Sequence, residues 1–245
     1  MSIHIEEEIK DFLNIKNGLP PKRGRYKKIK DRKGNCLWHY WAENDKPENI
    51  WDKWSHKLKT ENVMEKNLNN ETVIDRLVIL NKEAAFNLLI KEFNICDIKQ
   101  LKTNNDETLL HLAVWSGNEN IINKVLELYG DDLPLFIDKQ NIDGETALMI
   151  AIHKENINII RKLLLSGANP NIQDNKLKNC MHHAADTGDI DIYSLLEEAG
   201  GEIDRLDILK RTAEDVFEKQ KNKGSKELEY IKNHWLKQYE KRTSV

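Results

Sequence analysis

Apolar side chains recur along this chain at intervals of three and four residues in short runs, the spacing of one face of an amphipathic helix. Residues 143–174, DGETALMIAIHKENINIIRKLLLSGANPNIQD, contain two such runs. Thr146 can cap the first helix, Ala151 permits close packing, and Gly167 can end the second helix. The second helix presents an apolar stripe made by Ile159, Leu163 and Leu164. The segment therefore predicts a pair of short helices that begins and ends at defined residues.

The start of this helix pair recurs along the chain. The position of its Thr is occupied in turn by Cys36, Thr72, Thr108, Thr146, Asn179 and Thr212, at intervals of 36, 36, 38, 33 and 33 residues. A repeated helix pair with a period near 33 residues is typical of a solenoid, in which each unit packs only against its neighbours. We place the extra residues of the three longer intervals in connections between units.

Three of these units resemble the ankyrin repeat. The chain reads TLLHLAVWSGN from Thr108 and NCMHHAADTGD from Asn179, and with residues 143–174 these segments match the family pattern Thr-Pro-Leu-His-x-Ala-Ala-x-x-Gly at most positions. The unit from Asp31, DRKGNCLWHYWA, keeps the Gly and the His of the pattern. The unit around Thr72, ETVIDRLVILN, departs further, because it has Asp75 in place of the His and larger residues, Leu77 and Val78, in place of the alanines.

The resemblance implies an all-α ankyrin-repeat solenoid of about six helix-turn-helix repeats, with degenerate outer repeats and a capping helix at each end. Residues 1–30 are expected to hold an N-terminal capping helix and a basic linker, residues 31–222 the repeat array, and residues 223–245 a C-terminal capping helix and tail. The repeats are expected at 31–66, 67–102, 103–140, 141–173, 174–206 and 207–222.

Composition narrows the class of protein. The chain has 38 Lys and Arg against 41 Asp and Glu, a net charge of −3, which disfavours a globally basic nucleic-acid binder. No apolar run reaches the roughly 18 residues that a transmembrane helix needs. Three widely spaced cysteines and the absence of a visible secretory signal favour a reducing compartment, so we expect a cytoplasmic protein.

The cysteines and histidines do not suggest catalysis or metal binding. Cys180, His182 and His183 lie close together, but no Cys-x-x-Cys pair, Gly-x-Ser-x-Gly, phosphate-binding glycine loop or His-Glu-x-x-His occurs. By the resemblance, His39, His111 and His182 occupy the position at which the family uses His to hydrogen-bond the neighbouring hairpin. We therefore expect no catalytic residue, no metal and no cofactor, and a protein that is not an enzyme.

The segment from Lys22 to Lys33, KRGRYKKIKDRK, has eight basic residues and one acid, whereas the repeat array is acidic overall. It allows three interpretations: a solvated loop, a nuclear-import or acidic-partner patch, or a contact with nucleic acid or an anionic membrane. Four tryptophans of the first repeat allow two interpretations: they fill the core beside repeat two, or some of them remain exposed as binding anchors. These are Trp38, Trp41, Trp51 and Trp54.

The family's recognition surface consists of the hairpin tips and the outward positions of each first helix, and the repeat register assigns these positions to residues of this chain. The residues expected to bind a partner are Trp115, Ile79, Leu80, Asn105, Glu107, Asp143, Glu145, His153, Lys154, Arg32 and Lys33. Asn35, Glu71, Leu68, Ile142, Lys176 and Asp186 are among the other positions that the register places there. Trp115, Ile79 and Leu80 are apolar where the fold requires no apolar residue, so we expect them to form the hot spot.

The resemblance implies a protein–protein interaction module, or adaptor, that binds a partner protein through the concave face of the array as a monomer or within a hetero-complex. One alternative is a secreted bacterial or viral effector that uses this face to engage a host protein, in which case the location is the host cytosol or nucleus. Another is a nucleic-acid-associated regulator that uses the basic segment 22–33.

Overall fold

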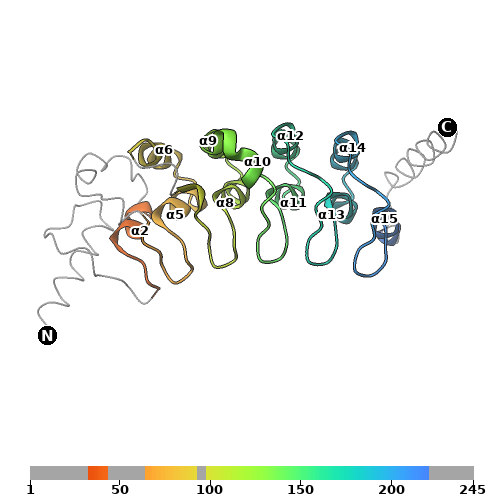
Figure 1. Ribbon diagram of the computed structural model, residues 1–245, viewed down its shortest axis with the longest axis horizontal. Helices are drawn as coiled ribbons and strands as arrows, with labels where there is room; N and C mark the ends of the chain where they lie inside the picture. Colours follow the sequence, from red (N-terminus) through yellow and green to blue (C-terminus); the bar gives the residue numbers. More distant parts are fainter. Residues whose placement is uncertain (1–32, 44–63, 93–97, 221–245) are drawn as a thin grey trace, which may run out of the picture. The chain divides into compact units, whose positions relative to one another are not determined.

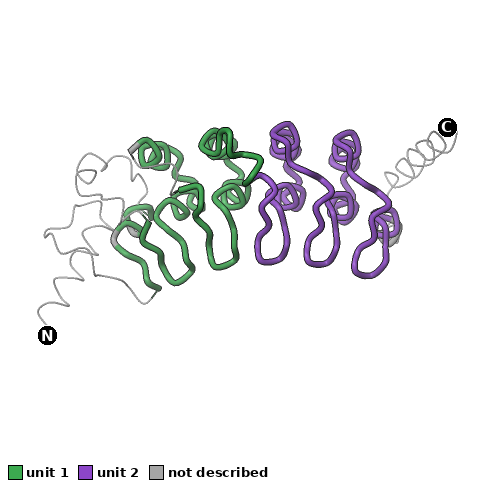
Figure 2. Tube along the Cα trace, in the orientation of Figure 1, with its two compact units in different colours: residues 1–136 green, residues 137–245 purple. Residues whose placement is uncertain are grey.

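The computed structural model describes residues 33–43, 64–92 and 98–220. The chain divides into two compact units, residues 1–136 and 137–245, which Figure 2 shows in green and purple. The expected capping helices at 1–30 and 223–245 lie outside the described residues, as do Arg32, Trp51, Trp54 and the basic segment apart from Lys33. In the described ranges, no helix is both long and apolar enough to cross a bilayer.

Unit 1 places short first helices in one layer and longer second helices in another (Figure 1). The first helices are α2 (Leu37–Ala42), α5 (Val73–Ile79) and α8 (Leu109–Ser116), which pack on one another in that order. The second helices are α6 (Glu83–Glu92) and α9 (Glu119–Tyr129), which also pack together. After α9, the longest interval of the sequence forms the 3-10 turn η4 (Gly130–Asp132) and α10 (Leu133–Phe136).

Unit 2 has the same plan. Its first helices are α11 (Ala147–His153), α13 (Cys180–Thr187) and α15 (Ala213–Gln220), and its second helices are α12 (Ile157–Leu165) and α14 (Ile190–Glu198). α13 packs on both α11 and α15, and α12 packs on α14. Hairpin loops project from the first helices on the side away from α12 and α14 (Figure 1).

Each first helix begins just after the repeated Thr position or the residue that replaces Thr there. The side chain at this position can accept a hydrogen bond from a backbone N–H of the first turn, which has no partner within the helix. In unit 1, Thr72 N donates to Asp75 Oδ2 at 2.8 Å while Asp75 N donates to Thr72 Oγ1 at 3.3 Å, which is a capping box. In unit 2, Asn179 Oδ1 accepts from His182 N at 3.2 Å in the same arrangement. Asn and Asp75 thus replace the usual Thr and His without loss of the cap.

A histidine ties α2 and α13 to the next hairpin, as the sequence predicts. His39 Nε2 lies 2.8 Å from the carbonyl oxygen of Glu71 in unit 1, and His182 Nε2 lies 3.0 Å from the carbonyl oxygen of Arg211 in unit 2. Burial lowers the pKa of both imidazoles. The resemblance-based role of these two histidines is confirmed, and they are structural.

Each hairpin is held by a polar side chain at its first position and a left-handed residue near its tip. In unit 1, Asn67 Oδ1 accepts from the amides of Asn69 and Glu71, both at 2.9 Å. In unit 2, a Cβ on Gly144, which has a φ of 80°, would lie 2.6 Å from the backbone nitrogen of Asn175 in the next hairpin. Glycine is therefore required at this tip.

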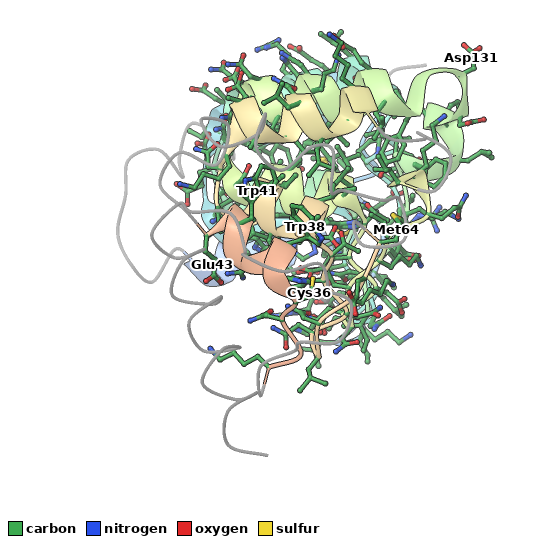
Figure 3. The ribbon with its side chains drawn as sticks, turned by 90° about the vertical axis from the view of Figure 1, so that its left-hand side faces the viewer. Cys36, Trp38, Trp41, Glu43, Met64 and Asp131 are labelled. Carbon is green, nitrogen blue, oxygen red and sulfur yellow. The ribbon has the colours of Figure 1, made fainter. Side chains whose placement is uncertain are left out.

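The core of each unit is the thin apolar layer between first and second helices. The buried residues of unit 1 also include Trp41 on α2, which is fully buried, and Trp38, whose ring centroid lies 6.3 Å away in an edge-to-face contact. Figure 3 shows both tryptophans on α2 and the exposed Glu43 just beyond the end of that helix. Trp38 and Trp41 therefore support the core interpretation and are not exposed anchors.

Candidate functional site

Two of the three apolar residues expected to form the hot spot of unit 1 are exposed to solvent, and the third is half-buried. Ile79 is the last residue of α5 and is 37% exposed, Leu80 follows it and is half-buried, and Trp115 near the end of α8 is 47% exposed. Because α5 packs directly on α8, the three residues lie on adjacent helices. We call Ile79, Leu80 and Trp115 the helix-end surface.

The local sequence explains why these side chains face outward. In α5 the residues Val73, Ile74, Leu77 and Val78 are buried, so the helical period turns Ile79 to solvent. In α8 every residue from Leu109 to Val114 is buried, and Trp115 is the first that is not. Departures from the family pattern in repeat two therefore leave its outward positions unchanged.

The hairpin tips of unit 1 are mainly polar. Asn105 and Lys33 are exposed, and Glu107 is half-buried because its Oε2 accepts a 2.9 Å hydrogen bond from Thr103 Oγ1. Asn35 differs from the sequence-based expectation: it is buried, and its Oδ1 accepts a 3.0 Å hydrogen bond from Asn67 Nδ2. The carboxylate of Glu107 and the amide of Asn35 thus hold hairpins together.

In unit 2, the corresponding helix positions are polar. Asp143, His153 and Lys154 are exposed, and Glu145 is half-buried. His153 Nε2 lies 3.4 Å from Glu145 Oε1, and this hydrogen-bonding partner lowers the pKa of the carboxyl group against the effect of burial. The predicted residues of this unit form a charged surface without an apolar centre.

A second histidine, His183 on α13, lies beside His153, with ring centroids 4.7 Å apart. Its Nε2 lies 3.2 Å from Asp174 Oδ2. Burial opposes ionisation of Asp174, but His183 and the amides of Lys178 and Lys176 keep the pKa of its carboxyl group below the usual value. Asp174 therefore anchors its hairpin as a carboxylate.

The cysteine and histidine cluster of α13 has the properties of a core. Cys180 is fully buried, and burial raises the pKa of its thiol, which disfavours a reactive thiolate. His182 is engaged with Asn179 and the Arg211 carbonyl. Across the described ranges, no three His, Cys, Asp or Glu residues are grouped so that they could hold a metal ion.

Sequence reasoning missed a set of exposed apolar residues at the hairpin tips of unit 2. Leu177, Leu206, Ile208 and Leu209 are exposed, in line with Ile142, which the register had placed at a tip. The signal was available in the aligned turns, since DNKLK and DILKR occupy the positions of NIDGE. The family pattern specifies other positions of the repeat, so it did not indicate these apolar residues.

Comparisons with known proteins agree with this geometry. A family model described as ankyrin repeats (3 copies) matches residues 127–207. A solved structure, "Crystal structure of the ankyrin repeat domain of Bcl-3: a unique member of the IkappaB protein family", matches with a TM-score of 0.65 and 16% identity, over 89% of this chain and 96% of that chain. The comparison with curated proteins finds no match.

The fold and its surfaces define a helical repeat scaffold of the kind that generally mediates protein–protein interactions and is typically not enzymatic. Residues 127–207 match the ankyrin repeat family model, and the structural match supports the same fold more widely along the chain. The ankyrin resemblance and the helical repeat fold inferred from the sequence are thereby confirmed, and the number of repeats stays a prediction.

Proposed function

We propose that this chain binds a partner protein through the helix-end surface of unit 1. The observation that carries the proposal is the 47% exposure of Trp115 on α8 beside the exposed Ile79 on α5. Tryptophan is strongly enriched among the residues that dominate binding energy at protein interfaces. A pair of large apolar side chains on neighbouring helices supplies an anchor for a partner.

The repeat register supports a binding role over a folding role for these residues. The position held by Ile79 and Trp115 is held by His153 in α11 and Asp186 in α13, and both of those are also exposed. Because α11 and α13 form with polar residues there, the fold does not require an apolar side chain at this position. An exposed Trp carries a hydration cost that binding would remove.

The surroundings fit a protein partner. Asn105 and the neighbouring Asn104 are exposed at the hairpin tip that precedes α8, and Asn69 is exposed at the tip that precedes α5. These uncharged polar tips precede α5 and α8, and the helix-end surface lies at the other end of the same two helices. The helix-end surface itself carries no charged residue, and charged residues are depleted at the core of a protein interface. We therefore expect an apolar side chain of the partner to cover Trp115.

The test compares the proteins that copurify with the wild-type chain, with Trp115→Ala and with a control, Leu165→Ala. Leu165 on α12 is 84% exposed, so the control removes a large apolar surface side chain elsewhere. We expect specific partners to remain with the control and to be lost with Trp115→Ala. Partners recovered equally by all three proteins would contradict the proposal.

A further inference from the structure

Three successive hairpins of unit 2 present large apolar side chains at their tips. They span residues 141–145, 174–178 and 207–211. Asn175 joins the first two, since its side-chain nitrogen donates to the Ile142 carbonyl at 2.8 Å. The apolar residues are 44–64% exposed, and with two lysines they make what we call the hairpin-tip surface: Ile142, Leu177, Leu206, Ile208, Leu209, Lys176 and Lys210.

The second and third hairpins are also joined through their backbones. Ile208 N donates to the Lys176 carbonyl at 2.9 Å. The side-chain nitrogen of Gln173 lies 2.6 Å from the Leu177 carbonyl and 3.3 Å from the Leu206 carbonyl. These bonds keep the apolar tips side by side, and Figure 1 shows the loops projecting from the same side of α11, α13 and α15.

The exposed charge on the second and third hairpins is positive. Lys176 and Lys210 are exposed at the tips, whereas the acids of the same hairpins, Asp174 and Asp207, are buried and hold the turns. Asp143 is exposed on the first hairpin and marks the edge of the cationic area. The surface thus combines apolar side chains with cations.

The backbone N–H groups of these two tips need no hydrogen bond from water. Every amide from 174 to 178 and from 207 to 211 donates to an acceptor within unit 2. Asp174 Oδ1, for example, accepts from Lys176 N and Lys178 N, both at 2.8 Å. Moving a backbone N–H without a hydrogen-bond partner from water into an apolar medium is unfavourable by several kcal/mol, and the N–H groups of these loops all have partners.

Leu177 occupies a backbone conformation that does not suit its side chain. Its φ is 58°, in the left-handed region where Gly, Asn and Asp are favoured. The aligned residues are Gly144 and Lys210 in unit 2 and Asn70 and Asp106 in unit 1. A branched apolar residue is thus kept at a strained and solvent-exposed position. Such a combination is more typical of a contact residue than of a folding requirement.

We propose that the hairpin-tip surface docks unit 2 on an anionic lipid bilayer. Leu177, Ile208 and Leu209 enter the boundary between headgroups and acyl chains, while Lys176 and Lys210 contact the anionic headgroups. Stable attachment to a membrane takes more than one signal, and the tips supply both an apolar and a cationic one. The satisfied amides favour a bilayer over a partner strand, because a strand would need free backbone donors.

The experiment measures cosedimentation of the full chain with vesicles of equal parts phosphatidylcholine and phosphatidylserine at low salt. The test variant is Ile208→Asn combined with Leu209→Asn, and the matched control is Leu165→Asn, which places the same residue on the exposed end of α12. We expect the double change to weaken vesicle binding at least about tenfold, and the control to leave it unchanged.

Further arms separate the apolar contribution from the cationic one and distinguish the bilayer from other partners. Replacement of Lys176 by Gln should weaken binding about fivefold, and vesicles of phosphatidylcholine alone should bind much less. Leu177→Asn tests the same surface with a residue that suits the backbone, so its loss of binding cannot result from misfolding. The proposal would be overturned if the wild-type protein did not bind anionic vesicles. It would also be overturned if these tips bound only an acidic protein segment. Binding that survives both tip variants would overturn it as well.

Discussion

Apart from Leu135 and Leu165, which lie on α10 and α12, the two units place most of their exposed large apolar residues in opposite parts of the same repeat. Unit 1 exposes Ile79 and Trp115 at its helix ends, and its hairpin tips are mainly polar, with Leu68 as an exception. Unit 2 has His153 and Asp186 at the helix ends and apolar residues at its tips. The repeat therefore fixes which positions are outward and leaves their chemistry free, so one fold can offer two kinds of surface.

What the units share is the set of buried positions that build the repeat. His39 and His182 bridge to the next hairpin, and Thr72 and Asn179 cap the first helices. Changes at shared positions should cost stability, whereas changes at the surface positions that differ should alter binding. The following substitutions test that division.

The largest effect is expected at the hairpin tip of unit 2 where glycine is required. Gly144→Ala places a Cβ 2.6 Å from the Asn175 backbone nitrogen at a φ of 80°. We expect unit 2 to lose about 3 kcal/mol of unfolding free energy, from strain and displacement of the next hairpin. Urea unfolding measures the loss. A change below about 0.5 kcal/mol would show that the hairpins do not pack as described.

A pH-dependent effect is expected in unit 1, where Asp75 replaces the usual histidine. Burial raises the pKa of Asp75 from 3.8 to about 6, so the folded state holds its proton more tightly than the unfolded state. The stabilisation by this group is therefore complete below pH 3.8 and lost as the pH rises through 6. His39 and His182 are buried and have lowered pKa values, so they have the opposite effect: the folded state loses their contribution to its stability as the pH falls.

Asp75→Asn keeps an oxygen that can accept from Thr72 and removes the ionisation. We expect the variant to gain stability relative to wild type as the pH rises from about 4 to 7, by about 2 kcal/mol. Urea unfolding at several pH values gives the difference between the two proteins. A difference that does not vary with pH would mean that Asp75 titrates normally in the folded chain.

Exchange of the left-handed tip residues should affect the two units in opposite directions. Leu177→Asn in unit 2 relieves a non-glycine residue with a φ of 58° and should raise stability by about 0.5–1 kcal/mol. Asn70→Leu in unit 1 introduces the same strain and removes a 2.8 Å hydrogen bond to the Lys102 carbonyl, so it should lower stability. Thermal unfolding of both variants measures the two changes in stability. Changes of the same sign would contradict this expectation.

The smallest effect on stability is expected at the helix-end surface. Trp115→Ala removes a side chain that is 47% exposed and should change the unfolding free energy by less than about 1 kcal/mol, while partner binding weakens by more. Differential scanning calorimetry provides the stability value. A loss of several kcal/mol would show that Trp115 supports the core instead of binding a partner.

The sequence predicted those features that depend on the local pattern of the repeat. The cap at Thr146, the bridging role of His182 and the outward placement of Trp115 all follow from register, because each is fixed within one helix pair and its neighbour. The replacement of His by Asp75 appeared to weaken repeat two, yet the carboxylate completes the same capping box. An aspartate can therefore cap this helix in place of the histidine, which the family pattern alone does not predict.

Other features depended on contacts that the pattern does not encode. Asn35 is buried because Asn67, 32 residues later, turns its side-chain nitrogen toward it. Leu177, Ile208 and Leu209 form one surface only because adjacent hairpins bond tip to tip. Such pairings between hairpins decide exposure, and they require the packed structure.

The most direct test of the central claim is hydrogen exchange of the full chain, with and without a partner protein recovered in the copurification experiment. We expect the bound partner to slow exchange at the ends of α5 and α8, around Ile79 and Trp115, and Trp115→Ala to reduce this protection at equal partner concentration. Protection confined to α6 and α9, with none at the ends of α5 and α8, would contradict it.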